Sequence, residues 1–154
     1  MRKSEWTTGL VYLCVLAMLP FAGHWTRRGA GRSCAYDGGK IEPLYKVRVV
    51  DRQGRDFEFC CIHCTEMWLR KEAEPQAVCV TDEISGEETE ASSAYFVRSF
   101  AVTNKTTGNR VHAFRTERDA EDHARSFRGR LLDEGEKPFM GQGSCSCQEP
   151  SLHK

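Results

Sequence analysis

Three closely spaced cysteines are the residues of this sequence best suited to chemistry. Cys64 lies four residues after Cys60 and three residues after Cys61. Thiols at either spacing project from one face of a helix. The partial positive charge of a helix N-terminus is expected to lower the pKa of such thiols and to favour the thiolate that metals bind. The spacing therefore predicts a site for a thiophilic metal ion.

Cys34 is predicted to supply a further sulfur. A hairpin that ends at Phe59 would return the chain to the residues before Tyr45, and Cys34 lies about ten residues earlier, within reach at about 3.3 Å per extended residue. Asp37 would add a carboxylate, which zinc accepts, whereas sulfur ligands alone suit copper(I). The predicted metal ligands are Cys34, Cys60, Cys61 and Cys64, with Asp37 and His63 as additional candidates.

Other interpretations of these cysteines stay open. In an oxidising compartment Cys60 or Cys61 could form a disulfide with Cys34, and the group would also suit a structural zinc module for protein interaction or a thiol-disulfide redox protein. His112 and His123 have no cysteine neighbours in the sequence and are predicted to be structural or surface residues. Because no set of nucleophile, base and orienting group is evident, no enzyme activity is predicted.

The elements that must position the first cysteines begin with a hairpin. Tyr45–Asp51 and Asp56–Phe59 alternate polar with apolar and β-branched residues, which predicts two strands with Gly54 in the turn between them. Ile62–Glu72 is rich in good helix formers, and Ala77–Thr81 is a short apolar run. The first half is therefore predicted to run strand, strand, helix, strand (ββαβ).

The second half repeats this order. Ala94–Val102 and Asn109–Phe114 are predicted strands, Thr116 is the predicted N-cap of a helix that ends at Gly129, and Arg130–Asp133 is the last strand. The chain is thus predicted to be an α+β protein of two pseudo-duplicated ββαβ units that follow an N-terminal hydrophobic helix.

Charge and hydropathy indicate the surroundings of this domain. Lysine plus arginine and aspartate plus glutamate both number 22 in 154 residues, so no net charge would attract nucleic acid. The apolar run 9–23 is flanked by basic residues and predicts an export signal or a membrane anchor. The predicted divisions are a signal or anchor at 1–28, a linker at 29–33, a metal-binding domain at 34–137 with repeats at about 34–83 and 88–133, and a disordered tail at 138–154.

Several sequence runs resemble a known family. CAYDGGKI, FCCIHCTEMWL, VTDEISGEETEASSAYFVRS and HAFRTERDAEDHARSFRGRLL are similar to the NosL family, accessory proteins of nitrous oxide reductase assembly, across most of residues 34–133. Cys34 with the C-x3-C pair also resembles the TRASH type of heavy-metal-sensing module. The NosL resemblance implies a duplicated ββαβ fold, export to the bacterial cell envelope and delivery of copper(I) to the assembly apparatus of a copper enzyme such as nitrous oxide reductase.

The expected function follows from the residues and the resemblance together. We expect a metal-binding accessory protein or copper(I) chaperone of the cell envelope, anchored in the membrane by its N-terminal helix and facing the periplasm or the exterior. Its expected partners are the metal ion and a client metalloenzyme or the machinery that assembles it, with no nucleic acid. Where the family commonly has a methionine, this chain has Asp37, Gly38 and Gly39, so zinc is the alternative metal.

Overall fold

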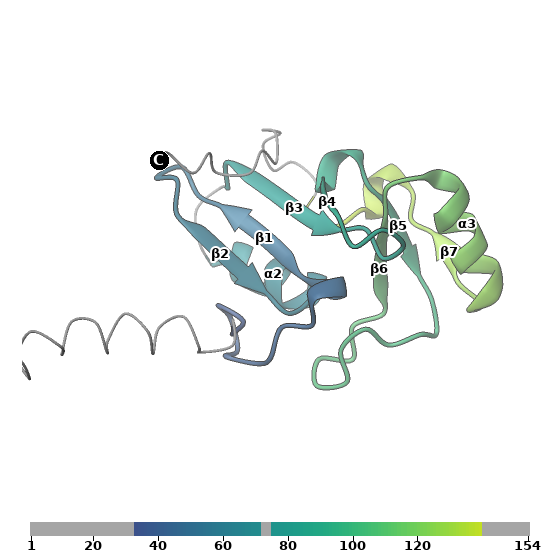
Figure 1. Cartoon of the computed structure of the whole chain (residues 1–154), viewed down its shortest axis with the longest axis horizontal. Coiled ribbons are helices and arrows are strands. Elements are labelled where there is room, and N and C mark those ends of the chain that lie inside the picture. The colour runs from purple at the N-terminus through teal and green to yellow at the C-terminus, as the bar shows by residue number, and fades with distance from the viewer. Residues whose placement is uncertain (1–32, 72–74, 140–154) are drawn as a thin grey trace, which may run out of the picture. The chain divides into compact units, whose positions relative to one another are not determined.

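The computed structural model describes residues 33–71 and 75–139 (Figure 1). The predicted anchor at 1–28 and nearly all of the predicted linker and tail lie outside these residues. Pro138 and Phe139, which the sequence places in the tail, are described and belong to the folded part, where the Phe139 ring packs edge-on against Phe96. Within 33–71 and 75–139, none of the helices has the length and apolar character needed to cross a membrane.

The first half of the described chain forms a four-stranded antiparallel sheet with strand order β2-β1-β3-β4. Helix α2 packs against one face of this sheet through Trp68, whose ring contacts Phe57 and Phe59. Asp51 closes the hairpin because its carboxylate accepts the backbone N–H groups of Gln53 and Arg55. The bounds are β1 Val47–Val50, β2 Asp56–Phe59, α2 Ile62–Leu69, β3 Ala77–Thr81 and β4 Glu88–Glu90, with a 3-10 turn η1 at Pro43–Tyr45.

The second half forms a three-stranded antiparallel sheet with strand order β6-β5-β7 and helix α3 packed on it (Figure 1). Thr116 caps α3, since its hydroxyl accepts the backbone N–H of Asp119, as the sequence predicts. The bounds are β5 Tyr95–Arg98, β6 Val111–Phe114, α3 Glu117–Ser126 and β7 Arg130–Leu131, with 3-10 turns η2 at Ala91–Ser93 and η3 at Glu134–Glu136.

The predicted α+β class, with two helices and antiparallel sheets in the described part, is confirmed. Several bounds differ, because the first helix ends at Leu69 and the strands expected at 94–102 and 130–133 are shorter. Strand β4 was not predicted at all, since its sequence Glu-Thr-Glu has no apolar pattern. Tertiary ion pairs hold it in place: Glu88 binds Lys46 at 2.7 Å and Arg48 at 2.9 Å.

One apolar core joins the two sheets. Phe96 of β5 is 1 % exposed and belongs to the same buried cluster as Val47, Val49 and Phe59 of the first sheet. The next residue, Val97, points to the opposite face and packs with residues of β6 and α3 in a smaller cluster. The alternation along β5 therefore serves both cores, and the burial of Phe96 ties the second sheet to the first.

Asp82 makes a polar link between the two halves. Its buried carboxylate accepts the backbone N–H and the hydroxyl of Ser85 at 2.9 and 2.6 Å, and the backbone N–H of Arg115 at 3.1 Å. Burial alone would raise the pKa of this carboxyl, but these hydrogen bonds outweigh it and lower the pKa below its ordinary value of 3.8.

We expect Asp82→Asn to destabilise the protein by about 1–3 kcal/mol at pH 7, because an amide N–H would face donors that now bind a carboxylate. A lowered folded-state pKa stabilises the fold above the unfolded pKa and loses that contribution as pH falls through the folded value. The stability difference from wild type should therefore shrink below about pH 4. Urea unfolding at several pH values measures this, with the exposed Glu87→Gln as control. A difference that stayed constant down to pH 2 would contradict it.

Candidate metal centre

Four potential ligands converge in the first half of the fold. One side-chain ligand atom from each of Cys34, Asp37, Cys60 and Cys64 lies within 4.8 Å of all the others. The three cysteines are buried, whereas Asp37 is exposed. The group is therefore a sulfur-rich cluster, defined here as the cysteine cluster, with a carboxylate at its solvent side.

A tight loop brings Cys34 to this cluster. The backbone N–H of Cys34 donates to Gly39 O, and the N–H of Gly38 donates back to Cys34 O, both at 2.8 Å. The N–H of Ala35 then donates to Glu58 O of β2 at 2.9 Å, which fastens the loop to the strand that leads to Cys60. Backbone hydrogen bonds therefore hold Cys34 close to the other cysteines. The sequence could predict this proximity only from the length of the intervening chain.

The start of α2 positions the remaining thiols. Cys61 is the N-cap in an extended conformation, so Cys60 precedes the helix and Cys64 lies in its first turn. The sulfur atoms of Cys60 and Cys64 are nevertheless only 3.5 Å apart. Cys61 Sγ lies 3.9 Å from Cys60 Sγ and contacts Thr107 Oγ1 at 3.4 Å, outside the four-ligand group. His63 is exposed and is not part of that group either.

The Asp37 side chain is oriented and ionised as a metal ligand would be. The backbone N–H of Gly39 donates to Asp37 Oδ1 at 2.9 Å, and this bond, with one from the Cys34 thiol, holds the pKa of Asp37 below its ordinary value. The other carboxylate oxygen, Oδ2, lies 3.3 Å from Cys64 Sγ and 3.9 Å from Cys60 Sγ. An ionised carboxylate therefore faces two thiols across a distance that one metal ion could occupy.

The second half contributes a residue that sequence reasoning missed. The side-chain amide of Asn104 donates to Cys60 Sγ at 3.2 Å, from a turn whose ends pair Asn104 with Asn109. Thr107 of the same turn contacts Cys61. A donor aimed at sulfur stabilises the charge of a bound thiolate, so this turn supports the cluster from outside the ligand group.

The expectation that the helix would lower the thiol pKa values is wrong for Cys60 and Cys64. Burial, followed by the neighbouring Cys61, raises the pKa of Cys60 to about 12 and raises that of Cys64 as well. Cys60 also stands before the helix rather than within its first turn. The metal-free cluster thus holds protonated thiols at neutral pH at these two positions, and metal binding must displace protons.

The four cysteines 34, 60, 61 and 64 are free thiols in the structure. The alternative pairing of Cys34 with Cys60 or Cys61 in a disulfide is therefore not what the structure contains. Cys79, which lies in the short apolar run 77–81, is 0 % exposed in β3.

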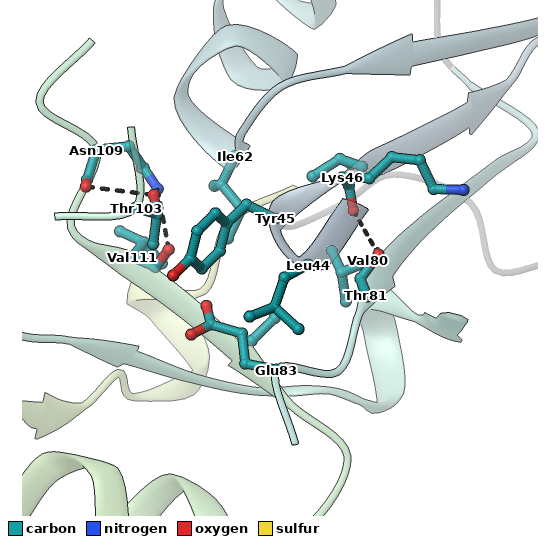
Figure 2. A pocket seen from close by; sticks show the side chains of 12 residues that line it. Leu44, Tyr45, Lys46, Ile62, Val80, Thr81, Glu83, Thr103, Asn109 and Val111 are labelled. Carbon is teal, nitrogen blue, oxygen red and sulfur yellow. Dashed lines mark hydrogen bonds between the residues drawn. The ribbon is translucent and has the colours of Figure 1, made fainter. Parts of the chain in front are cut away.

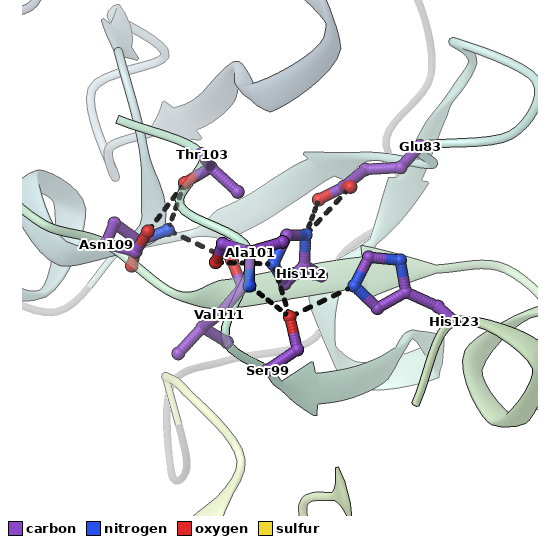
Figure 3. A network of polar contacts seen from close by, with 8 residues as sticks. All are labelled: Glu83, Ser99, Ala101, Thr103, Asn109, Val111, His112 and His123. Atoms are coloured by element: carbon purple, nitrogen blue, oxygen red, sulfur yellow. Dashed lines mark hydrogen bonds and ion pairs between the residues drawn. The ribbon is translucent and has the colours of Figure 1, made fainter. Parts of the chain in front are cut away.

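A second polar group lies in the other half, where His112 of β6 and His123 of α3 meet (Figure 3). His112 Nδ1 is 2.9 and 3.0 Å from the carboxylate oxygens of Glu83. Ser99 Oγ lies between the histidines, 3.1 Å from Nε2 of His112 and 3.2 Å from Nε2 of His123. Burial, together with the neighbouring His112, lowers the pKa of His123 to about 4.

This group was not predicted from the sequence. The sequence showed no nucleophile beside a histidine that is oriented by a third residue. Ser99, His112 and Glu83 do have the connectivity of a hydrolase triad. Ser99 is only 5 % exposed, however, and its hydroxyl oxygen accepts the backbone N–H of Ala101. A serine held in this way is not presented to a substrate, so the geometry does not support hydrolysis.

A separate pocket lies where the two halves meet (Figure 2). Leu44 and Tyr45 line it from η1, Val111 from β6, and Thr103 and Asn109 from the turn that supports the cysteine cluster. Asn109 Nδ2 donates to Thr103 Oγ1 at 2.6 Å and braces this wall. None of the described residues that line the pocket is a cysteine, so the pocket is distinct from the cysteine cluster.

The described residues define an α+β protein with a cluster of three buried thiols and one exposed carboxylate. No protein-family model matches the sequence, and no curated protein matches it. Among solved structures, the chain is similar to the copper chaperone NosL from Shewanella denitrificans, with a TM-score of 0.58 and 18 % sequence identity over 68 % of this chain and 87 % of that one. The chain therefore has a NosL-like fold, as the sequence resemblance predicts, and at this identity the likeness concerns the fold.

Proposed function

We propose that this chain is a metal-binding accessory protein that holds copper(I) in the cysteine cluster and passes it to a client. The observation that carries the proposal is the convergence of Cys34, Cys60, Cys64 and Asp37 on a fold shared with a copper chaperone. A holding protein needs ligands but no reacting group, so this function requires no catalysis.

The ligand types favour copper(I). Three soft sulfur donors suit this ion, which is commonly coordinated by two or three of them. The sulfurs of Cys60 and Cys64 are already adjacent, and Asn104 is placed to stabilise a thiolate at Cys60. Zinc is the second candidate metal, because Asp37 would complete a four-coordinate site of three sulfurs and one oxygen.

The position of Asp37 suits the transfer of an ion. The three sulfurs are buried and only the carboxylate side of the cluster is exposed. A partner would therefore approach from the Asp37 side, where a weak oxygen ligand for copper(I) is the first to be displaced. Ligand exchange would then proceed thiol by thiol toward a similar site on the partner.

We further propose a client and a location on the basis of the sequence resemblance. The client would be a copper enzyme such as nitrous oxide reductase, or the machinery that assembles it. Residues 1–28 would act as signal or anchor, residues 29–33 as linker, and the domain would face the periplasm or the exterior. The thiols would stay reduced there only while metal or a reductant protects them.

We also infer that the two halves are copies of one ββαβ unit. In the first half β3 pairs with β1, and in the second half β7 pairs with β5, so the third strand lies beside the first in both. Only the first copy carries the cysteine cluster.

The decisive experiment is an anaerobic titration of the reduced full-length protein with copper(I) in competition with a chromogenic copper(I) chelator. We expect one tightly bound ion per chain, with protons released as the raised thiol pKa values require. Zinc added at equal concentration should not displace it. Binding of zinc in preference to copper(I) would favour the second candidate, and failure to compete with the chelator would overturn the proposal.

A further inference from the structure

The group around His112 has the composition of a metal site, although it contains no sulfur. Glu83 comes from the turn after β3, His112 from β6 and His123 from α3, so three separate elements bring their side chains together (Figure 3). One ligand atom of each lies within 4.8 Å of the other two. Two imidazoles and one carboxylate form a set that binds zinc in proteins.

The hydrogen-bond partners of His112 allow either neutral form of its ring. Its Nδ1 faces the Glu83 carboxylate at 2.9 Å, and its Nε2 faces the carbonyl oxygen of Ala101 at 3.2 Å. Nε2 also lies 3.1 Å from the Ser99 hydroxyl, which can donate to it, so a neutral ring is satisfied with its proton on Nδ1. With the proton on Nε2 instead, the Ala101 carbonyl accepts it and Nδ1 can ligate a metal ion beside Glu83.

The distances suit a metal ion with little rearrangement. Tetrahedral zinc with ligands at about 2.0–2.1 Å separates neighbouring ligand atoms by about 3.3 Å. The separation between His112 Nδ1 and the nearer Glu83 oxygen is 2.9 Å, so these two need to open only slightly. A ligand atom of His123 lies within 4.8 Å of both, and a bound ion would draw this partly exposed side chain of α3 inward.

We propose that Glu83, His112 and His123 form a second metal site, for a divalent ion of the zinc class, that shares no ligand with the cysteine cluster. The three ligands come from both halves of the fold, because Glu83 follows β3 of the first sheet. An ion bound there fastens the turn after β3 to β6 and α3 and stabilises the junction between the halves. Nitrogen and oxygen ligands favour this ion over copper(I), which the cysteine cluster prefers.

Zinc titration of a full-length protein without the competing thiols tests the site. In Cys60→Ser with Cys64→Ser, we expect one Zn2+ per chain, a rise in thermal midpoint on zinc addition and a zinc-dependent shift of the 15N resonances of the His112 and His123 rings. Adding His123→Gln or Glu83→Gln should weaken zinc binding by at least about 10-fold and abolish the rise. Glu121→Gln, an exposed carboxylate on the same helix, is the matched control and should change neither.

A second measurement covers the case in which the double serine variant fails to fold. Cobalt(II) titration of the wild-type protein should show a first ion with sulfur-to-cobalt charge transfer and a second ion without it, and His123→Gln should lose only the second. A folded protein that takes up no ion outside the cysteine cluster would overturn the proposal. So would binding that His123→Gln and Glu83→Gln leave unchanged. Neither result bears on copper(I) binding by the cysteines, so the two proposals fail separately.

Discussion

Replacing Cys64 with serine is expected to lower the copper(I) affinity of the protein by more than about 100-fold. This loss should exceed the loss caused by removing a supporting residue that is not itself a ligand. Cys64 Sγ is central in the cluster, because it lies 3.5 Å from Cys60 Sγ and 3.3 Å from Asp37 Oδ2. A hard hydroxyl oxygen does not replace a soft thiolate for this ion. Competition with a copper(I) chelator measures the change.

Cys61→Ser is the matched control for this experiment. Cys61 is as deeply buried as Cys64 and belongs to the same segment, but its sulfur contacts Thr107 and lies outside the four-ligand group. We expect Cys61→Ser to retain most of the affinity, and thermal unfolding of both variants separates a lost ligand from a lost fold. Equal losses in the two variants would show that the ion is held by a different set of sulfurs from the one that the geometry indicates.

Replacing Phe96 with alanine is expected to destabilise the fold by about 3–5 kcal/mol. Phe96 is 1 % exposed and packs from β5 into the core of the first sheet, so its loss would leave a cavity between the two halves. A domain of this size is stable by only about 5–15 kcal/mol, and the change would therefore take a large share of the total. Urea denaturation followed by circular dichroism measures it.

Phe100→Ala provides the control, since the Phe100 side chain is 69 % exposed only four residues away. Its substitution should change the unfolding free energy by less than about 0.5 kcal/mol. Because the core is shared, Phe96→Ala should lower the stability of both halves in a single transition. Two separate transitions, with only the second half weakened, would mean that the halves fold independently.

The cysteine cluster meets two conditions that the proposed carriage of copper(I) requires. The burial that raises the pKa values of the Cys60 and Cys64 thiols keeps these groups protonated when no metal is bound. A protonated thiol is a poor nucleophile, so the empty cluster is less prone to oxidation than a thiolate would be. Copper(I) binds strongly enough to sulfur to displace these protons, whereas a weakly bound ion would not.

Local sequence patterns were sufficient for most of the elements in the described part. Alternation in 45–51 and 56–59 predicts the first hairpin, and Thr116 followed by Asp119 predicts the start of α3, because these signals depend on neighbours in the chain. Strand β4 escaped prediction because its acidic sequence has no apolar pattern. It forms where Lys46 and Arg48, distant in sequence, neutralise Glu88.

The composition of the cysteine cluster could be predicted in part. The sequence predicts that the sulfurs of Cys60 and Cys64 lie together, and they do at 3.5 Å, although Cys60 precedes the helix. The length of chain before the hairpin puts Cys34 within reach. Spacing did not reveal that Cys61 would turn toward Thr107 instead. The thiol pKa values also could not be inferred, since they depend on burial, which is a property of the whole fold.

The sequence by itself determined which residue types were available for soft-metal chemistry and which local elements would carry them. Only the tertiary structure decided that Asn104 would face Cys60, and that Glu83, His112 and His123 would meet at one point. The physical reason is that hydrogen bonds and metal ligation need atoms within a few ångströms. For residues tens of positions apart, the packing of the sheets against a shared core sets those distances, and no local pattern in the chain records them.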